Sequence, residues 1–140
     1  MINTRISAPG STLTVLLAED DLDDQELLKQ AFLEIDPNIQ LYSFSTGKKF
    51  LDNLQNFETV PHLIILDYNI PEMNGAEILK HINGNDQYLS MVKIVWSTSN
   101  SPYYENSCLA LGAHAYFVKP ATMAGLTQLA KTMLSYVERS

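Results

Sequence analysis

The chain of 140 residues carries 16 acidic and 9 basic side chains, and its formal net charge is −7. This length and a hydrophobic content of 46% predict one globular domain with a real core, whereas the charge argues against direct binding of nucleic acid. A single cysteine excludes an internal disulfide, and no apolar run approaches the roughly 20 residues of a membrane-spanning helix. We therefore expect a cytoplasmic protein that does not enter a membrane.

The chain alternates between short apolar runs and segments whose apolar residues have helical spacing. Residues 1–12 have the composition of a flexible N-terminal tail, and residues 13–140 form the predicted domain. The predicted strands are residues 13–18, 39–44, 63–66, 91–96 and 114–118.

A predicted helix follows each of these strands. The first is expected to begin at an Asp21 N-cap and to bury the stripe Leu27, Leu28, Ala31, Phe32 and Ile35. The third covers residues 76–82, the fourth runs from an N-cap at Ser101 to Gly112, and the last begins at about Thr122.

This alternation predicts an α/β fold with a doubly wound parallel sheet of five strands and five helices on its two faces. In the flavodoxin-like strand order 2-1-3-4-5, the topological switch point lies between strands one and three. Ligands of open α/β sheets bind at the carboxyl ends of the strands beside this point, so the residues that end those strands are the candidates for function.

Polar side chains follow four of the apolar runs directly. Glu19 and Asp20 end the first strand, Asp67 the third, Ser97 the fourth and Lys119 the fifth. Because three neighbouring carboxylates repel one another, we expect a hard dication, most simply Mg²⁺, among them. With Asp67 as nucleophile, such a site suits phosphoryl transfer.

These residues stand in motifs that resemble the receiver domain of two-component response regulators, in its stand-alone, CheY-like form. Ser97 and Lys119 follow Asp67 by 30 and 52 residues, which are the family's intervals, and the resemblance runs from Leu13 to about Val137. The motifs are Val15-Leu16-Leu17-Ala18-Glu19-Asp20-Asp21, Leu66-Asp67-Tyr68-Asn69-Ile70-Pro71-Glu72-Met73-Asn74-Gly75, Ser97 and Tyr116-Phe117-Val118-Lys119-Pro120.

The resemblance implies a role for each matching position at the metal. Asp67 would be the phospho-acceptor, and Asp20 would bind Mg²⁺ directly. Glu19 would act through water, and the backbone carbonyl of Asn69 would complete the protein ligands. Glu19 departs from the family's usual aspartate, and Asn74 stands where the family often has aspartate.

The resemblance also implies a conformational switch. Ser97 would be the switch hydroxyl, Tyr116 the aromatic side chain that follows its movement, and Lys119 the second cation on the phosphoryl group. The family keeps the bond corresponding to Lys119–Pro120 in the cis form.

As a single-domain regulator, the protein would receive its phosphoryl group from a sensor histidine kinase or a histidine phosphotransfer protein. It would signal to a downstream protein through the fourth helix, fifth strand and fifth helix, as a monomer or homodimer. Beyond the formation and hydrolysis of its own aspartyl phosphate, we expect no enzymatic activity.

Two alternatives stay open. A phosphatase of the haloacid-dehalogenase class also uses an aspartate nucleophile, but it needs a second aspartate where this chain has Asn69, and asparagine cannot donate the proton. A scaffold that works without phosphorylation would bind its partner equally well after Asp67→Asn.

Overall fold

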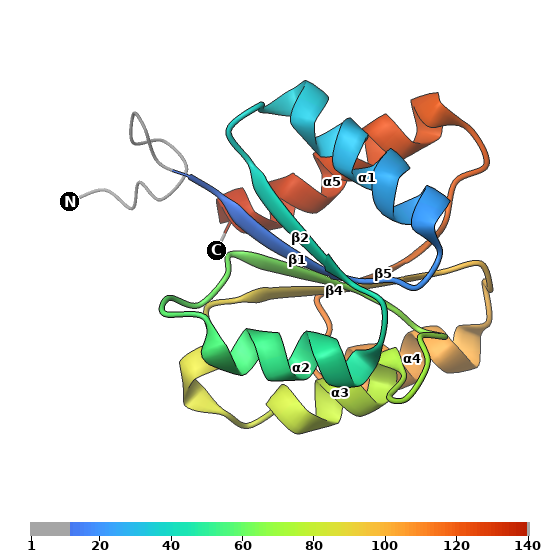
Figure 1. Ribbon diagram of the computed structural model, residues 1–140. Helices are drawn as coiled ribbons and strands as arrows, with labels where there is room; N and C mark the ends of the chain where they lie inside the picture. The colour runs from blue at the N-terminus through green and yellow to red at the C-terminus, as the bar shows by residue number, and fades with distance from the viewer. Residues whose placement is uncertain (1–11, 140) are drawn as a thin grey trace.

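The computed structural model describes residues 12–139, and Figure 1 shows a central sheet between two layers of helices. Within these residues, five strands alternate with five α-helices, and a short 3-10 helix, η1, precedes the fourth strand. In chain order the elements are β1 (Thr14–Ala18), α1 (Leu22–Ile35), β2 (Gln40–Phe44), α2 (Gly47–Asn56), β3 (Leu63–Asp67), α3 (Gly75–Ile82), η1 (Asp86–Tyr88), β4 (Val92–Ser97), α4 (Pro102–Ala110), β5 (Ala115–Val118) and α5 (Met123–Arg139).

The strands lie in the order β2-β1-β3-β4-β5, and all four pairings are parallel. This confirms the predicted doubly wound, flavodoxin-like α/β fold. The register sets Asp67 of β3 opposite Trp96 of β4, and Ser97 opposite Val118 of β5. The carboxyl ends of these strands therefore form one edge, with β1 and β3 adjacent at the switch point.

Helices α1 and α5 cover one face of the sheet, and α2, α3 and α4 cover the other (Figure 1). Successive strand residues point to opposite faces of the sheet and so belong to two hydrophobic cores. Val15 and Leu17 pack toward α1 and α5, whereas Leu16 and Ala18 pack toward α2, α3 and α4. All five residues of β3 are buried, and the last of them is Asp67, whose carboxylate lies at the edge of the sheet.

The start of α3 packs closely against the end of β3. Asn74 and Glu77 form a capping box, in which each side chain accepts a hydrogen bond from the other residue's backbone N–H at 2.9 Å. A Cβ added at Gly75 would stand 3.0 Å from the carbonyl oxygen of Asp67. Glycine at this position therefore lets α3 begin directly behind the carboxylate.

The predicted inward stripe of α1 is wrong at one position. Leu28, Ala31 and Phe32 are fully buried, but Leu27 is 41% exposed. Neighbouring residues of a helix are about 100° apart around its axis, so Leu27 lies beside the buried stripe rather than within it. The predicted N-terminal tail lies, except for Thr12, outside the described residues.

The expectation of a cis Lys119–Pro120 bond is also wrong, because residues 12–139 contain no cis peptide bond. The bond has the trans form that X–Pro bonds favour. In that same part of the chain, every helix is too short or too polar to span a bilayer.

Candidate functional site

Asp67 is buried at the carboxyl edge of the sheet, where the sequence predicts the site. Its Oδ1 accepts a hydrogen bond from the backbone N–H of Asn69 at 2.9 Å, and its Oδ2 lies 3.0 Å from Nζ of Lys119. One carboxylate oxygen is thus held by the backbone, while the other faces a cation. Asn69 reaches the site through its N–H, and the role of its carbonyl as a metal ligand stays a prediction.

Lys119 is positioned by the end of β5. Its backbone N–H donates to the carbonyl oxygen of Ser97 at 2.8 Å, which ties the chain after β5 to the end of β4. Its Nζ lies 4.9 Å from the centroid of the Trp96 ring, which extends the apolar surface beneath the side chain. The side chain therefore crosses the end of β4 toward β3 and β1.

The Lys119 ammonium meets three carboxylates at its far end. Nζ lies 2.8 Å from Glu19 Oε1, 2.9 Å from Asp24 Oδ2 and 3.0 Å from Asp67 Oδ2. Burial by itself lowers the pKa of Lys119, but the contacts with Glu19 and Asp24 outweigh it and raise this pKa above its ordinary value. Lys119 is therefore a fixed positive charge at physiological pH.

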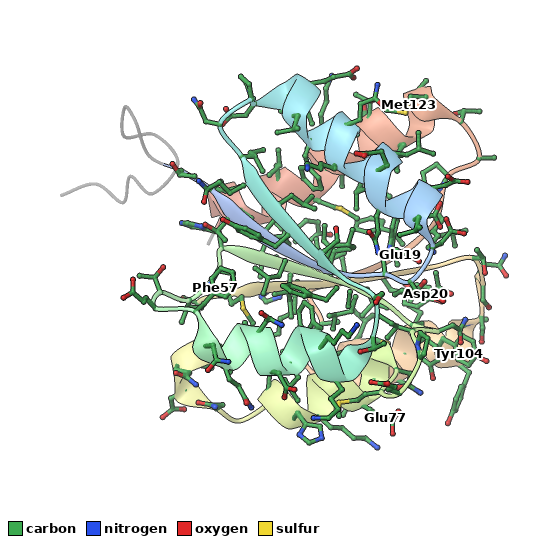
Figure 2. All side chains as sticks on the ribbon, in the orientation of Figure 1. Glu19, Asp20, Phe57, Glu77, Tyr104 and Met123 are labelled. Atoms are coloured by element: carbon green, nitrogen blue, oxygen red, sulfur yellow. The ribbon has the colours of Figure 1, made fainter. Side chains whose placement is uncertain are left out.

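Glu19, Asp20 and Asp67 each direct one carboxylate oxygen to a common place, and these three oxygens lie within 4.8 Å of one another. Figure 2 shows the side chains of Glu19 and Asp20 where β1 leaves the sheet. Carboxylate oxygens are ligands that Mg²⁺ prefers, so these three side chains would hold one such ion between them.

The buried Glu19 carboxylate supports this fit. Oε2 accepts from the backbone N–H of Asp21 at 3.0 Å, and the buried Oε1 faces Lys119 Nζ at 2.8 Å. Burial raises the pKa of Glu19 to about 7, although Lys119 and the Asp21 N–H act in the opposite direction. A divalent cation would compensate the charge of this buried carboxylate and of its two acidic neighbours, and the residues present therefore fit Mg²⁺.

Ser97 and Tyr116, the predicted switch pair, meet at the loop after β4. Ser97 is completely buried, and its Oγ accepts from the backbone N–H of Ser99 at 3.1 Å. The hydroxyl of Tyr116 donates to the carbonyl oxygen of the same Ser99 at 2.7 Å. Both side chains thus bind one residue of this loop, and their switch roles stay predictions.

The structure adds Asp24 to the predicted set. Asp24 is not among the residues that the sequence predicts for the site, but the first turn of α1 brings it to Lys119, 95 positions away in the chain. The available signal was the run of acids at the start of a helix that follows β1 at the switch point.

A second addition is aromatic. Tyr68, which directly follows the predicted phospho-acceptor, stacks on Tyr104 of α4, with ring centroids 4.1 Å apart and planes at 15°. Tyr104 lies in the first turn of α4 and is half-buried against the loop after β3. The stack joins this loop to α4.

Comparisons with known proteins agree with this architecture. Residues 15–131 match the family model of the response regulator receiver domain. The two-component response regulator ARR8 of Arabidopsis thaliana is 29% identical over 141 residues, in an alignment that covers 89% of this chain and 62% of ARR8. The two-component response regulator ORR3 of Oryza sativa subsp. indica is 27% identical, with 86% of this chain and 89% of ORR3 covered. The alignment thus spans less than two thirds of the length of ARR8, but most of the length of ORR3.

Two solved structures show the same fold. The phosphorylated cyanobacterial phytochrome response regulator RcpA superimposes with a TM-score of 0.82 at 23% identity, over 89% of this chain and 93% of RcpA. The response regulator RPA3017, in red light signaling of R. palustris, gives 0.78 at 26% identity, over 89% and 92% of the two chains. Since the family model spans most of the chain, this chain belongs to the response regulator receiver domain family of two-component systems.

Proposed function

We propose that Asp67 accepts a phosphoryl group from a sensor histidine kinase or a histidine phosphotransfer protein, in a reaction that depends on Mg²⁺. The observation that carries this proposal is the approach of Lys119 Nζ to within 3.0 Å of Asp67 Oδ2, beside the converging oxygens of the acidic cluster. A carboxylate nucleophile, a fixed cation and a set of hard oxygen ligands are the parts that phosphoryl transfer to an aspartate requires.

In the proposed reaction, Oδ2 of Asp67 attacks the phosphorus of a phosphohistidine. The new P–O bond forms as the P–N bond breaks, and the departing imidazole keeps the electron pair and takes up a proton. The N–H of Asn69 holds Oδ1 and so fixes the direction in which Oδ2 points. Lys119 then faces the transferred group and offsets the charge that it brings.

Glu19, Asp20, Asp67 and the carbonyl oxygen of Asn69 would hold the Mg²⁺ ion. When bound, Mg²⁺ neutralises negative charge on the phosphoryl oxygens. The protein's own contribution is to gather these ligands at one strand edge. Beyond the formation and loss of this aspartyl phosphate, we infer no metabolic reaction, because Asn69 cannot act as the general acid that a haloacid-dehalogenase phosphatase needs at that position.

The output is proposed to be a changed protein-interaction surface formed by α4, β5 and α5. The Ser97 hydroxyl would bind the phosphoryl group, and the loop that it shares with Tyr116 would move with it. Exposed apolar side chains on α4 and β5 support a protein partner at this surface. They are Tyr103, which is 72% exposed, Leu109 and Val118.

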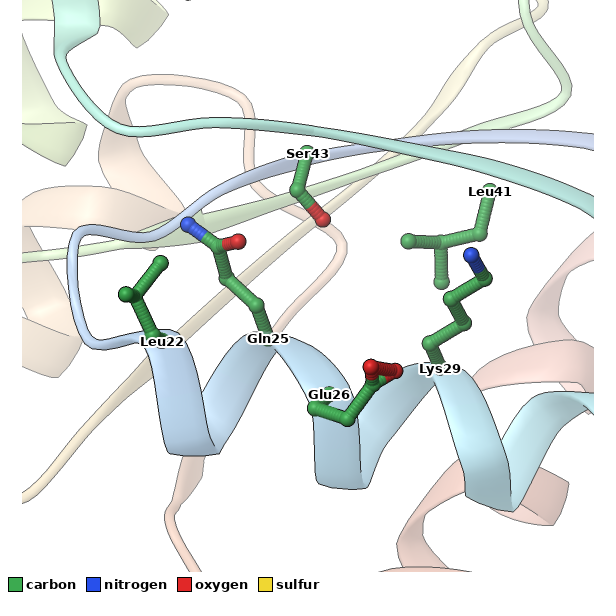
Figure 3. A pocket seen from close by; sticks show the side chains of 6 residues that line it. All are labelled: Leu22, Gln25, Glu26, Lys29, Leu41 and Ser43. Atoms are coloured by element: carbon green, nitrogen blue, oxygen red, sulfur yellow. The ribbon is translucent and has the colours of Figure 1, made fainter.

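The donor protein is proposed to approach along α1, next to the acidic cluster. Leu22, at the start of this helix, is 73% exposed. Figure 3 shows that it borders a hollow between α1 and β2, which is also lined by Gln25, Glu26, Lys29, Leu41 and Ser43. A protein that covered Leu22 would remove its apolar surface from water, which favours association.

The test is intact-mass spectrometry after incubation with acetyl phosphate or phosphoramidate. With Mg²⁺ the protein should gain the mass of one phosphoryl group, and it should gain none when EDTA replaces Mg²⁺ or in the Asp67→Asn variant. Asp52→Asn is the matched control, because Asp52 is exposed on α2 and pairs only with Lys48 among the described residues. A gain that persists in Asp67→Asn would refute the proposal, and partner binding unchanged by that variant would favour the scaffold alternative.

A further inference from the structure

Asp24 is the one acid around Lys119 that stands outside the predicted metal cluster, within the part of the chain that the structure describes. The oxygens that converge for a metal belong to Glu19, Asp20 and Asp67, whereas Asp24 contacts only the ammonium, at 2.9 Å. The Asp24 side chain is 34% exposed and that of Lys119 is 11% exposed, so this contact lies at the rim of the site.

The first turn of α1 holds Asp24 in this place. The Asp21 side chain accepts from the Asp24 backbone N–H at 3.0 Å, and the Gln25 side-chain amide donates to the carbonyl oxygen of Glu19. The cap fixes the backbone of Asp24, and the Gln25 contact ties the helix start to the end of β1. The Asp24 carboxylate therefore has a defined position relative to Lys119.

Asp24 also reaches Lys119 from a different side than the other two acids do. A small cavity of about 100 Å³ separates the start of α1 from the segment that follows β5. Asp24, Lys119 and the Trp96 ring all line it, and Glu19 and Asp67 do not. If a metal ion engaged Glu19 and Asp67 and Asp24 were absent, this cavity would leave the ammonium room to turn toward α5.

We propose that Asp24 is a positioning residue, which keeps the Lys119 ammonium directed at Asp67 when the other carboxylates engage a metal ion and a phosphoryl group. This inference rests on the proposed phosphorylation of Asp67. Glu19 and Asp67 would then interact with the metal ion and the phosphoryl group as well as with Lys119. Asp24 would keep Lys119 as its partner throughout. Its contribution is geometric, so an acceptor oxygen in the same place should suffice.

The kinetic test measures the rate of phosphorylation by phosphoramidate at saturating Mg²⁺. Asp24→Ala should slow the reaction about 10-fold, as the loss of a supporting contact typically does. Asp24→Asn keeps an acceptor oxygen and should stay within about 3-fold of the wild type. Asp23→Ala is the matched control, since it removes an exposed acid from the same helical turn and should leave the rate unchanged.

A second readout does not depend on phosphorylation. Trp96 is the chain's only tryptophan, and it lies 4.9 Å from Lys119 Nζ, so its fluorescence reports the position of this ammonium when Mg²⁺ is added to the unphosphorylated protein. Asp24→Ala should shift the emission of Trp96, whereas Asp24→Asn and Asp23→Ala should not.

Each other result overturns the inference. An unchanged or faster reaction in Asp24→Ala would mean that Asp24 does not direct Lys119, and equal losses in Asp24→Asn and Asp24→Ala would assign the effect to charge alone. A loss in Asp23→Ala as large as that in Asp24→Ala would assign it to the helix terminus. If the wild-type protein takes up no phosphoryl group, the proposed function fails, and an unshifted Trp96 emission in Asp24→Ala overturns the positioning role independently.

Discussion

Two lysines of this domain are largely withdrawn from solvent, and their surroundings differ completely. The ammonium of Lys119 meets three carboxylates at the carboxyl edge of the sheet. Lys93 lies within β4, and its Nζ donates to the backbone carbonyl oxygens of Tyr88 and Met91 at 2.9 and 3.0 Å. Lys93 thus ties the end of η1 to the strand that follows it, whereas Lys119 serves a site.

The pKa values of the two lysines shift in opposite directions. Burial lowers the pKa of Lys93, and the neutral carbonyls that it binds do not compensate. Burial acts on Lys119 in the same direction, but its acidic neighbours Glu19 and Asp24 reverse the outcome. Charged partners, rather than burial, therefore distinguish a lysine suited to chemistry from one that holds a loop.

The largest expected effect separates the two lysines by function. Lys119→Met should slow phosphorylation about 100-fold or more, because it removes the cation that faces the transferred group. Lys93→Met is the matched control and should leave the rate within about 2-fold, since the Lys93 ammonium binds the carbonyl oxygens of Tyr88 and Met91, just before β4. The rates can be followed by intact mass with phosphoramidate. Equal losses in the two variants would contradict the distinction.

A smaller effect appears in the pH dependence of stability. The pKa of Lys93 is lower in the folded protein than its ordinary 10.5, so the unfolded chain binds more protons between these two values. Its contribution to the free energy of unfolding should therefore rise with pH up to about 10.5, by at most about 1.4 kcal/mol per pH unit.

Lys119 should show the opposite sign. Its pKa is raised in the folded protein, so its contribution is complete below 10.5 and is lost only as the pH rises further. Urea unfolding of the wild type, Lys93→Met and Lys119→Met is measured between pH 8 and 10.5. The wild-type minus variant difference should rise with pH for Lys93→Met and stay constant for Lys119→Met. A wild-type minus Lys93→Met difference that falls with pH in this range would refute our assignment for Lys93.

The smallest effect concerns Cys108, whose buried thiol lies on the inner face of α4. Burial raises the pKa of Cys108 from 9.0 to about 11, which lowers the thiolate fraction about 100-fold near pH 8. Because the chain has one cysteine, labelling with Ellman's reagent reports on this thiol alone. It should be slow in the folded protein and fast in urea, and rapid labelling without urea would contradict the burial.

The fold, and the meeting of Asp67 with Lys119, could be predicted from the sequence because four of the five strands are followed by a polar residue. Asp67 and Lys119 each follow a run of apolar residues directly, and parallel pairing then brings their side chains to one edge. That Asp67 and Lys119 would meet therefore follows from the topology.

Contacts that depend on side-chain reach were not predictable in this way. The interaction of Asp24 with Lys119 depends on how the first turn of α1 leans over the strand ends, which no local pattern encodes. Lys93 interrupts an apolar run, and its partners arise from η1, which the sequence analysis missed. The exposure of Leu27 likewise follows from the rotation of α1 about its own axis.

The central claim, that Asp67 is the phosphorylated residue, is tested most directly by chemical trapping. Borohydride reduces an aspartyl phosphate to homoserine, so treatment of the phosphorylated protein followed by peptide mass spectrometry identifies the modified position. Our account predicts homoserine at position 67, and no reduction of the neighbouring acids Glu19, Asp20 and Asp24 to their alcohols. Reduction at one of those acids, with Asp67 intact in a protein that has gained a phosphoryl group, would contradict it.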